Sequence, residues 1–145
     1  MPVLPVIRAT LAGRLRAIRR DDAGRDDGRT KAMPMDSTDL ADLIDELTAT
    51  ARDASSGRAA RTIRGGHEHA LRETVIALRA GHELAEHESP HEATLQVLRG
   101  RVRLVAGDES WEGASGDHLT VPPSRHSLAA LDDSVVLLTV SNRMP

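Results

Sequence analysis

The seven histidines carry most of the chemistry that this chain can offer, because it contains no cysteine. His87 and His91 lie in a segment bounded by Gly81 and Gly100, and His126 lies further along the chain. Neutral imidazole binds divalent transition metals, and it also exchanges protons near neutral pH. A metal in this chain must therefore be held by histidine, carboxylate or amide groups, since no thiolate is present.

These histidines belong to two glycine-bounded segments, GHELAEHESPHEATLQVLRG at 81–100 and GDHLTVPPSRH at 116–126. The segments resemble the two signature motifs of the cupin superfamily, whose members are small β-barrels that often hold one divalent metal. The resemblance implies a cupin jelly-roll barrel with His87 and His126 at the centre of the metal site. Cupins of this size include dioxygenases, isomerases, lyases and proteins without a known reaction.

The sequence departs from the family pattern at two ligand positions of the first motif. Ser89 stands where that motif has its second histidine, and Ala93 stands where it has a glutamate. We expect His91 to complete the site as the third ligand, with Glu92 and Gln96 as secondary candidates. Strand parity turns Glu92 away from the interior unless a bulge just before it reverses the pleat. The amide of Gln96 is explained more readily by hydrogen bonds to backbone groups than by a metal.

The other four histidines and the only aromatic residue are expected to have structural or surface roles. His67 and His69 form an H-x-H pair whose spacing would let both touch one metal, but their glycine-rich surroundings favour solvated turn residues. His82 and His118 are expected at strand edges on the surface. Trp111 is expected to anchor the core or an interface rather than to stack against a ligand.

The residues that must position these groups form short strands. Stretches rich in apolar and β-branched residues, separated by Gly, Asp and Ser turns, occur at 71–78, 93–99, 101–105, 119–121 and 135–140. Short strands at this spacing predict a sandwich or a barrel. The predicted fold class is therefore all-β, with the cupin barrel over residues 58–142.

A helix is predicted before the barrel. Apolar residues recur at the spacing of one helical face, at Leu40, Leu43, Ile44 and Leu47. Ser37 or Thr38 is expected to cap its N-terminus. We assign residues 36–57 to this amphipathic helix and a linker, packed against the barrel or against a second subunit.

The net charge is distributed unevenly along the chain. Residues 1–35 carry a net charge of +4, and the remainder carries −7. The composition of 1–35 is typical of a disordered basic tail or an upstream extension of the reading frame, with Met33 or Met35 as the true start. A contact with nucleic acid or an acidic partner is the alternative for this tail. The overall net charge of −3 argues against general nucleic-acid binding.

Two function hypotheses follow. In the first, the barrel binds a divalent metal (Zn, Fe, Mn or Ni), a small molecule, or both, and the reaction and its catalytic residues stay open. In the second, it is a non-enzymatic ligand-binding or regulatory module without a metal. We expect a homodimer, because sheet edges need cover. We expect no nucleic-acid or membrane partner and a cytoplasmic location, since no stretch is long enough to span a bilayer and the N-terminus lacks the pattern of a secretory signal.

Overall fold

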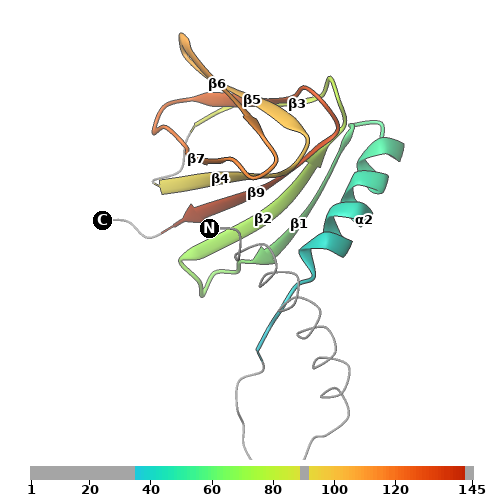
Figure 1. Ribbon diagram of the computed structural model, residues 1–145. Coiled ribbons are helices and arrows are strands. Elements are labelled where there is room, and N and C mark those ends of the chain that lie inside the picture. The colour runs from blue at the N-terminus through green and yellow to red at the C-terminus, as the bar shows by residue number, and fades with distance from the viewer. Residues whose placement is uncertain (1–34, 89–91, 143–145) are drawn as a thin grey trace, which may run out of the picture. The chain divides into compact units, whose positions relative to one another are not determined.

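Two antiparallel sheets face each other, and one helix packs on the outside of the larger sheet (Figure 1). The structure, a computed structural model, describes residues 35–88 and 92–142. The tail predicted for residues 1–35 lies outside the described residues except for its last position, and so does His91. Within the described ranges, no helix combines the length and the apolarity needed to cross a membrane.

The elements follow the predicted order of one helix and then strands. They are α2 (Leu40–Asp53), β1 (Arg58–Arg64), β2 (Leu71–Leu78), β3 (Glu83–His87), β4 (Glu92–Arg99), β5 (Arg101–Ala106), β6 (Glu109–Ala114), β7 (His118–Thr120), β8 (His126–Ala130) and β9 (Ser134–Ser141). The first sheet has the strand order β1-β2-β9-β4-β7, and the second has the order β3-β8-β5-β6. The all-β fold class with a preceding helix is confirmed.

The first sheet is apolar on both faces. Its inner face and that of the second sheet enclose a barrel core of Leu78, Ala93, Leu95, Val97, Val102, Leu104, Val121, Leu128, Ala130 and Val136. Its outer face packs against α2 in a helix core of Leu43, Leu47, Ala51, Val75, Ala77 and Val135. The alternation of side chains along a strand explains how β2 contributes to both cores, since successive residues point to opposite faces.

The helix begins later in the chain than a cap at Ser37 or Thr38 would place it. Asp39 is the N-cap, and its carboxylate accepts a hydrogen bond from the backbone N–H of Asp42 at 3.2 Å. Asp39 has extended backbone angles, φ −76° and ψ 99°, so the first helical residue is Leu40. Ser37 and Thr38 therefore lie outside the helix, and the prediction that one of them caps it was wrong.

Asp133 joins the end of α2 to the turns of the barrel. Its carboxylate accepts hydrogen bonds from the backbone N–H of Ala80 and from Nε of Arg52, both at 2.9 Å. The bond from Ala80 is the main cause, and the Arg52 guanidinium the next, of a pKa for Asp133 below the usual value. The charged form of this carboxylate is thus favoured by folding.

We therefore expect Asp133→Asn to destabilise the fold in a pH-dependent way. Because the folded-state pKa is the lower one, the stabilisation is fully present above the unfolded pKa of about 3.9 and is lost as the pH falls through the folded-state pKa. Urea unfolding across a pH series should show a gap between native protein and variant that is widest near neutrality and narrows in acid. Asp108→Asn, in the exposed turn after Gly107, is the control. A gap that stays constant with pH would contradict this role.

Candidate metal and ligand site

Two histidines meet at one end of the second sheet. The ring centroids of His87, on β3, and His126, on β8, are 4.5 Å apart with an angle of 67° between the ring planes. His126 is 5% exposed, whereas His87 is exposed, so solvent reaches the pair from the His87 side. The two imidazoles named from the sequence are therefore in contact.

A β-bulge turns His87 toward its partner. Leu84 lies opposite Leu128, and both pack in the barrel core, so a regular strand would point His87, three residues later, to the outside. The pairing shifts between Leu84 and His87, and this brings His87 opposite His126. Bulges are known to re-aim side chains in this way. The bulge considered just before Glu92 would fall on residues 89–91, which lie outside the described residues.

Backbone carbonyls orient both rings. Nδ1 of His87 lies 3.0 Å from the carbonyl oxygen of Ala85, and Nδ1 of His126 lies 2.9 Å from that of Ser124. A carbonyl oxygen only accepts hydrogen bonds, so each Nδ1 carries the proton and donates it. Each Nε2 is then left with its lone pair. A hydrogen bond from the other ring nitrogen to a carbonyl is the usual way in which metal-binding histidines are held.

The pair borders a small apolar cavity inside the barrel. This cavity has a volume of about 30 Å³, room for roughly one water-sized group. The side chains of both histidines line it together with Ile76, Leu84, Leu95, Leu104, Val121, Leu128, Val136 and Leu138. A charge or dipole placed there would be shielded from water by aliphatic walls, which strengthens its interaction with the imidazoles.

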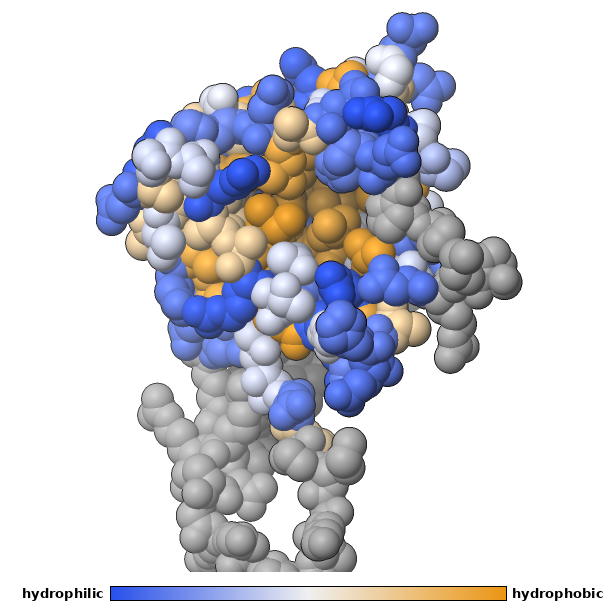
Figure 2. Space-filling view, turned by 180° about the vertical axis from the view of Figure 1, so that it is seen from behind, coloured by the Kyte–Doolittle hydropathy of each residue, from blue (hydrophilic) through white to orange (hydrophobic). Residues whose placement is uncertain are grey.

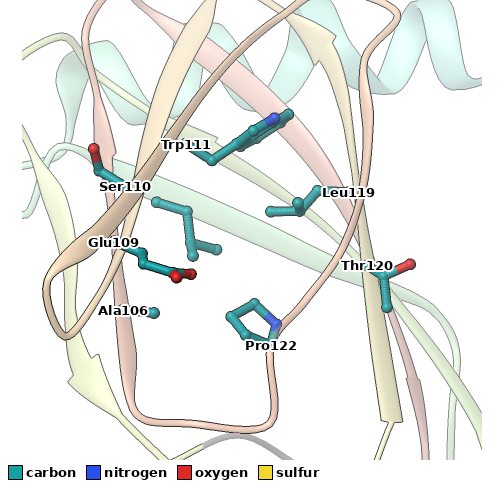
Figure 3. A pocket seen from close by; sticks show the side chains of 8 residues that line it. Ala106, Glu109, Ser110, Trp111, Leu119, Thr120 and Pro122 are labelled. Carbon is teal, nitrogen blue, oxygen red and sulfur yellow. The ribbon is translucent and has the colours of Figure 1, made fainter.

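A larger cavity lies beside it, and Leu104 lines both. This second cavity has a volume of about 220 Å³. Its walls come from β5, β6 and β7 and the residues after β7: Leu104, Ala106, Glu109, Ser110, Trp111, Leu119, Thr120 and Pro122 (Figure 3). In the space-filling view, apolar residues gather in a hollow on the face seen from behind, with polar residues around its rim (Figure 2).

The secondary ligand candidates do not join the histidine pair. Glu92 and Gln96 are exposed on β4, while the residues between them that point inward, Ala93 and Leu95, belong to the barrel core. Glu92 lies opposite Ser141 in regular register, so no bulge reverses it. Because Gln96 is exposed, its amide does not need the backbone hydrogen bonds that were expected for it. His91, the first-ranked third ligand, falls outside the described residues, so its placement stays a prediction.

The remaining histidines lie away from the pair. His67 and His69 lie in the turn before β2, where Nδ1 of His69 is 3.3 Å from a guanidinium nitrogen of Arg64. His118 is exposed at the start of β7, as expected. His82 lies just before β3 and is half-buried, with its Nε2 2.9 Å from the guanidinium of Arg79 and its ring against Gly57.

The arrangement offers two of the ligands that a divalent metal takes. Zinc–imidazole bonds are about 2.0–2.1 Å long, and two rings at the observed separation can direct their Nε2 atoms to one ion. Among residues 35–88 and 92–142, no group of three His, Cys, Asp or Glu side chains gathers in a way that could hold a metal. The described residues thus fit a metal in part, and a third ligand is needed.

The sequence reasoning missed Glu109, whose side chain points into the larger cavity (Figure 3). A signal for it was present. Gly107 and Asp108 have the composition of a turn between two strands, and a two-residue hairpin turn pairs the residues that flank it. That pairing joins Glu109 to Ala106 and places Glu109 on the same face as Trp111. Trp111 itself packs against the barrel core as expected, and it also forms a wall of the cavity.

No protein-family model matches the sequence, and no curated protein matches it either. Solved structures do match the fold. A conserved protein of unknown function from Streptococcus pyogenes is 22% identical, with a TM-score of 0.59 over 80% of this chain and 95% of that one. A cupin superfamily protein from Desulfitobacterium hafniense is 15% identical, with a TM-score of 0.59 over 79% of this chain and 99% of that one.

An enzyme of known activity shares the same architecture. Salicylate 1,2-dioxygenase from Pseudoaminobacter salicylatoxidans, in complex with gentisate, is 22% identical, with a TM-score of 0.57 over 69% of this chain and 32% of that one. Sequence identities of 15% and 22% indicate a shared fold but not a shared reaction. Together with the strand order of the two sheets, these likenesses identify the fold of this chain as that of a small cupin domain.

Proposed function

We propose that this barrel binds a small organic molecule in its larger cavity and a divalent metal at the His87–His126 pair, with His91 as the third ligand. The observation that carries the metal proposal is the orientation of the two rings. Both Nδ1 atoms are engaged by backbone carbonyls, and both Nε2 atoms are left for an ion. Zn, Fe, Mn and Ni all accept imidazole ligands. A bound metal of this kind would polarise a carbonyl or enolate oxygen or activate O2.

The second candidate function is a ligand-binding module that uses no metal. It is favoured by the exposed positions of Glu92 and Gln96, which leave the described residues with only two ligands at the pair. It is also consistent with the larger cavity, since the described residues that form its walls include no histidine. In this alternative the Nε2 atoms of the histidine pair accept hydrogen bonds from the ligand at the wall of the smaller cavity.

Metal titration of the full chain separates these two functions. We expect Ni²⁺ or Zn²⁺ to bind at one equivalent in calorimetry, and His87→Ala to weaken that binding at least about tenfold, because two imidazoles with one further ligand hold an ion and fewer do not. His87 is exposed, so its replacement should leave the melting temperature nearly unchanged. His91→Ala tests the third ligand in the same way.

His118→Ala is the matched control, since it removes an exposed imidazole from a strand of the other sheet. The control should bind the metal as the native protein does. The metal proposal would be overturned if the native protein bound no stoichiometric metal, or if His118→Ala weakened metal binding as much as His87→Ala does. The function would then be that of the ligand-binding module without a metal.

The homodimer stays a prediction. The edge strands of the two sheets are β1 and β7 in the first and β3 and β6 in the second. Each presents unpaired backbone groups, which is the reason for expecting a partner copy.

A further inference from the structure

The larger cavity has the chemistry of an anionic pocket with apolar walls. Its volume of about 220 Å³ lies below the range of about 300–1,000 Å³ that is typical of sites for drug-sized ligands, so it suits a smaller molecule. Leucine, alanine and proline side chains and the indole of Trp111 form its walls (Figure 3). Such a pocket selects its ligand through the few polar groups that point into it.

One acidic side chain supplies that polarity. Glu109 and Trp111 lie on the inner face of β6, opposite Ala106 and Leu104 of β5. The hydroxyl groups of Ser110 and Thr120 are directed away from the cavity, whereas the carboxylate of Glu109 is directed into it (Figure 3). The walls formed by the described residues contain no lysine, arginine or histidine. A bound anion would therefore meet an uncompensated like charge.

The carboxylate of Glu109 is also not engaged by the residues that the structure describes. On the outer face of the same sheet, Arg103 pairs with Glu112, and Arg101 pairs with Asp132 at 3.1 Å. Within the described part of the chain, no side chain makes such a pair or a hydrogen bond with Glu109. Its negative charge is thus available to a ligand, and a cation is the ligand group that it would attract.

The indole of Trp111 is held in place in the wall of the same cavity. A Cβ atom added to Gly113 would lie 2.1 Å from the indole ring, so the ring packs directly on the glycine backbone. Glu109 and Trp111 are two residues apart on one face of β6, so their Cα atoms are about 7 Å apart, and the indole extends over Gly113, away from Glu109. An ammonium group bound at the carboxylate of Glu109 would therefore leave the apolar part of its ligand to pack toward the indole.

We propose that this cavity binds a small apolar molecule that carries an ammonium group, with the ammonium at the carboxylate of Glu109 and the apolar part against Leu104, Trp111 and Leu119. The inference rests on the proposal that the barrel binds a small molecule, but it does not require a metal at the histidine pair. It names the charge and the polarity of the ligand class, and it excludes carboxylate and phosphate ligands from this cavity.

Benzylammonium chloride is the probe for this proposal, with benzyl alcohol and sodium benzoate as the neutral and anionic counterparts of the same shape. Trp111 is the only aromatic residue besides the histidines, so the tryptophan fluorescence of the full chain reports on the cavity wall without other contributions. We expect saturable binding of benzylammonium, about five- to tenfold tighter than that of benzyl alcohol, and no binding of benzoate. Part of the preference should be lost at high salt, because the carboxylate is exposed.

Glu109→Gln removes the charge while keeping the shape of the side chain, and should weaken benzylammonium binding about five- to tenfold while leaving benzyl alcohol unaffected. Glu112→Gln makes the same change on the same strand but on the outer face, and should leave the binding of every probe unchanged. Equal affinity of the native protein for all three probes would overturn the proposal, even if the barrel binds small molecules. Unchanged benzylammonium affinity in Glu109→Gln, or no saturable binding to the native protein, would also overturn it.

Discussion

Gly100→Ala should lower the free energy of unfolding by roughly 2–5 kcal/mol, because a left-handed backbone costs a residue with a Cβ about 1–2 kcal/mol and a forced contact about 1–3 kcal/mol. Gly100 connects β4 to β5, where the chain passes from one sheet to the other, and its φ is +82°. An added Cβ would lie 2.4 Å from the carbonyl oxygen of Asp133 and 2.4 Å from Oγ of Ser134.

Those neighbouring atoms have little freedom to move. Ser134 is 2% exposed, and its hydroxyl donates to the carbonyl of Arg101 at 2.9 Å or to that of Asp132 at 2.7 Å. The same hydroxyl oxygen accepts a hydrogen bond from the backbone N–H of Arg101 at 3.1 Å. A methyl group at Gly100 would have to break this network or displace the turn before β9.

Gly107→Ala is the matched control for the steric part of this effect. Gly107 also has a left-handed φ, +60°, but an added Cβ would meet no heavy atom within 4 Å. We expect it to cost only the conformational term of about 1–2 kcal/mol. Urea unfolding of the two variants should therefore give clearly different midpoints. Equal losses in both would show that the contact with Ser134 carries no cost.

Leu104→Ala should destabilise the fold by about 2–5 kcal/mol, the range for leucine truncations in protein cores. Leu104 is 5% exposed and lies between Trp111 and Leu128 in the second sheet. It lines the cavity beside the histidine pair and the larger cavity as well, so its side chain forms part of both walls. Its truncation leaves a void that apolar neighbours on all sides can fill only in part.

The neighbouring Val105→Ala is the control for this variant. Val105 is 37% exposed and points to the outer face of the same strand, so its truncation should cost about 0.5 kcal/mol or less. Thermal unfolding should then separate the two variants by several degrees. If Leu104→Ala lowered the free energy of unfolding as little as the control does, the residues around Leu104 would have repacked without a cost in stability, and the prediction would be wrong.

The fold could be predicted where apolar residues mark a strand clearly. The span of β2, Leu71–Leu78, was predicted to the residue, and β9 was predicted to within one residue at each end. The strands β1, β3, β6 and β8 were missed. Their sequences RAARTIR, ELAEH, ESWEGA and HSLAA are short or mostly polar, and their pairing partners decide their structure. The helix was found from its apolar stripe, but its cap was assigned wrongly because four consecutive residues before it can all act as caps.

The candidate site could be predicted only as far as its residue types. His87 and His126 were named from the two segments, and the structure brings their rings together. The reason that they meet, the bulge after Leu84, depends on the register between two strands and cannot be read from one strand alone. The direction of Gln96 needed no such information, because it shares the strand parity of Glu92, and both are exposed whereas Ala93 and Leu95 pack inward.

The position of β2 and β9 between the barrel core and the helix core makes the stability of this domain unequal from one layer to the next. Local unfolding of α2 breaks the helix core and the ion pairs Arg52–Asp133, Arg61–Glu46 and Arg99–Asp45, while the barrel core stays intact. It also breaks the hydrogen bonds that Arg79 and Arg99 donate to Arg52 and Thr48 of the helix. Such an opening would expose a strip of the sheet that contains Val75, Ala77 and Val135. Exposed apolar surface promotes association between protein molecules. By burying this strip, α2 protects the outer face of the first sheet from aggregation.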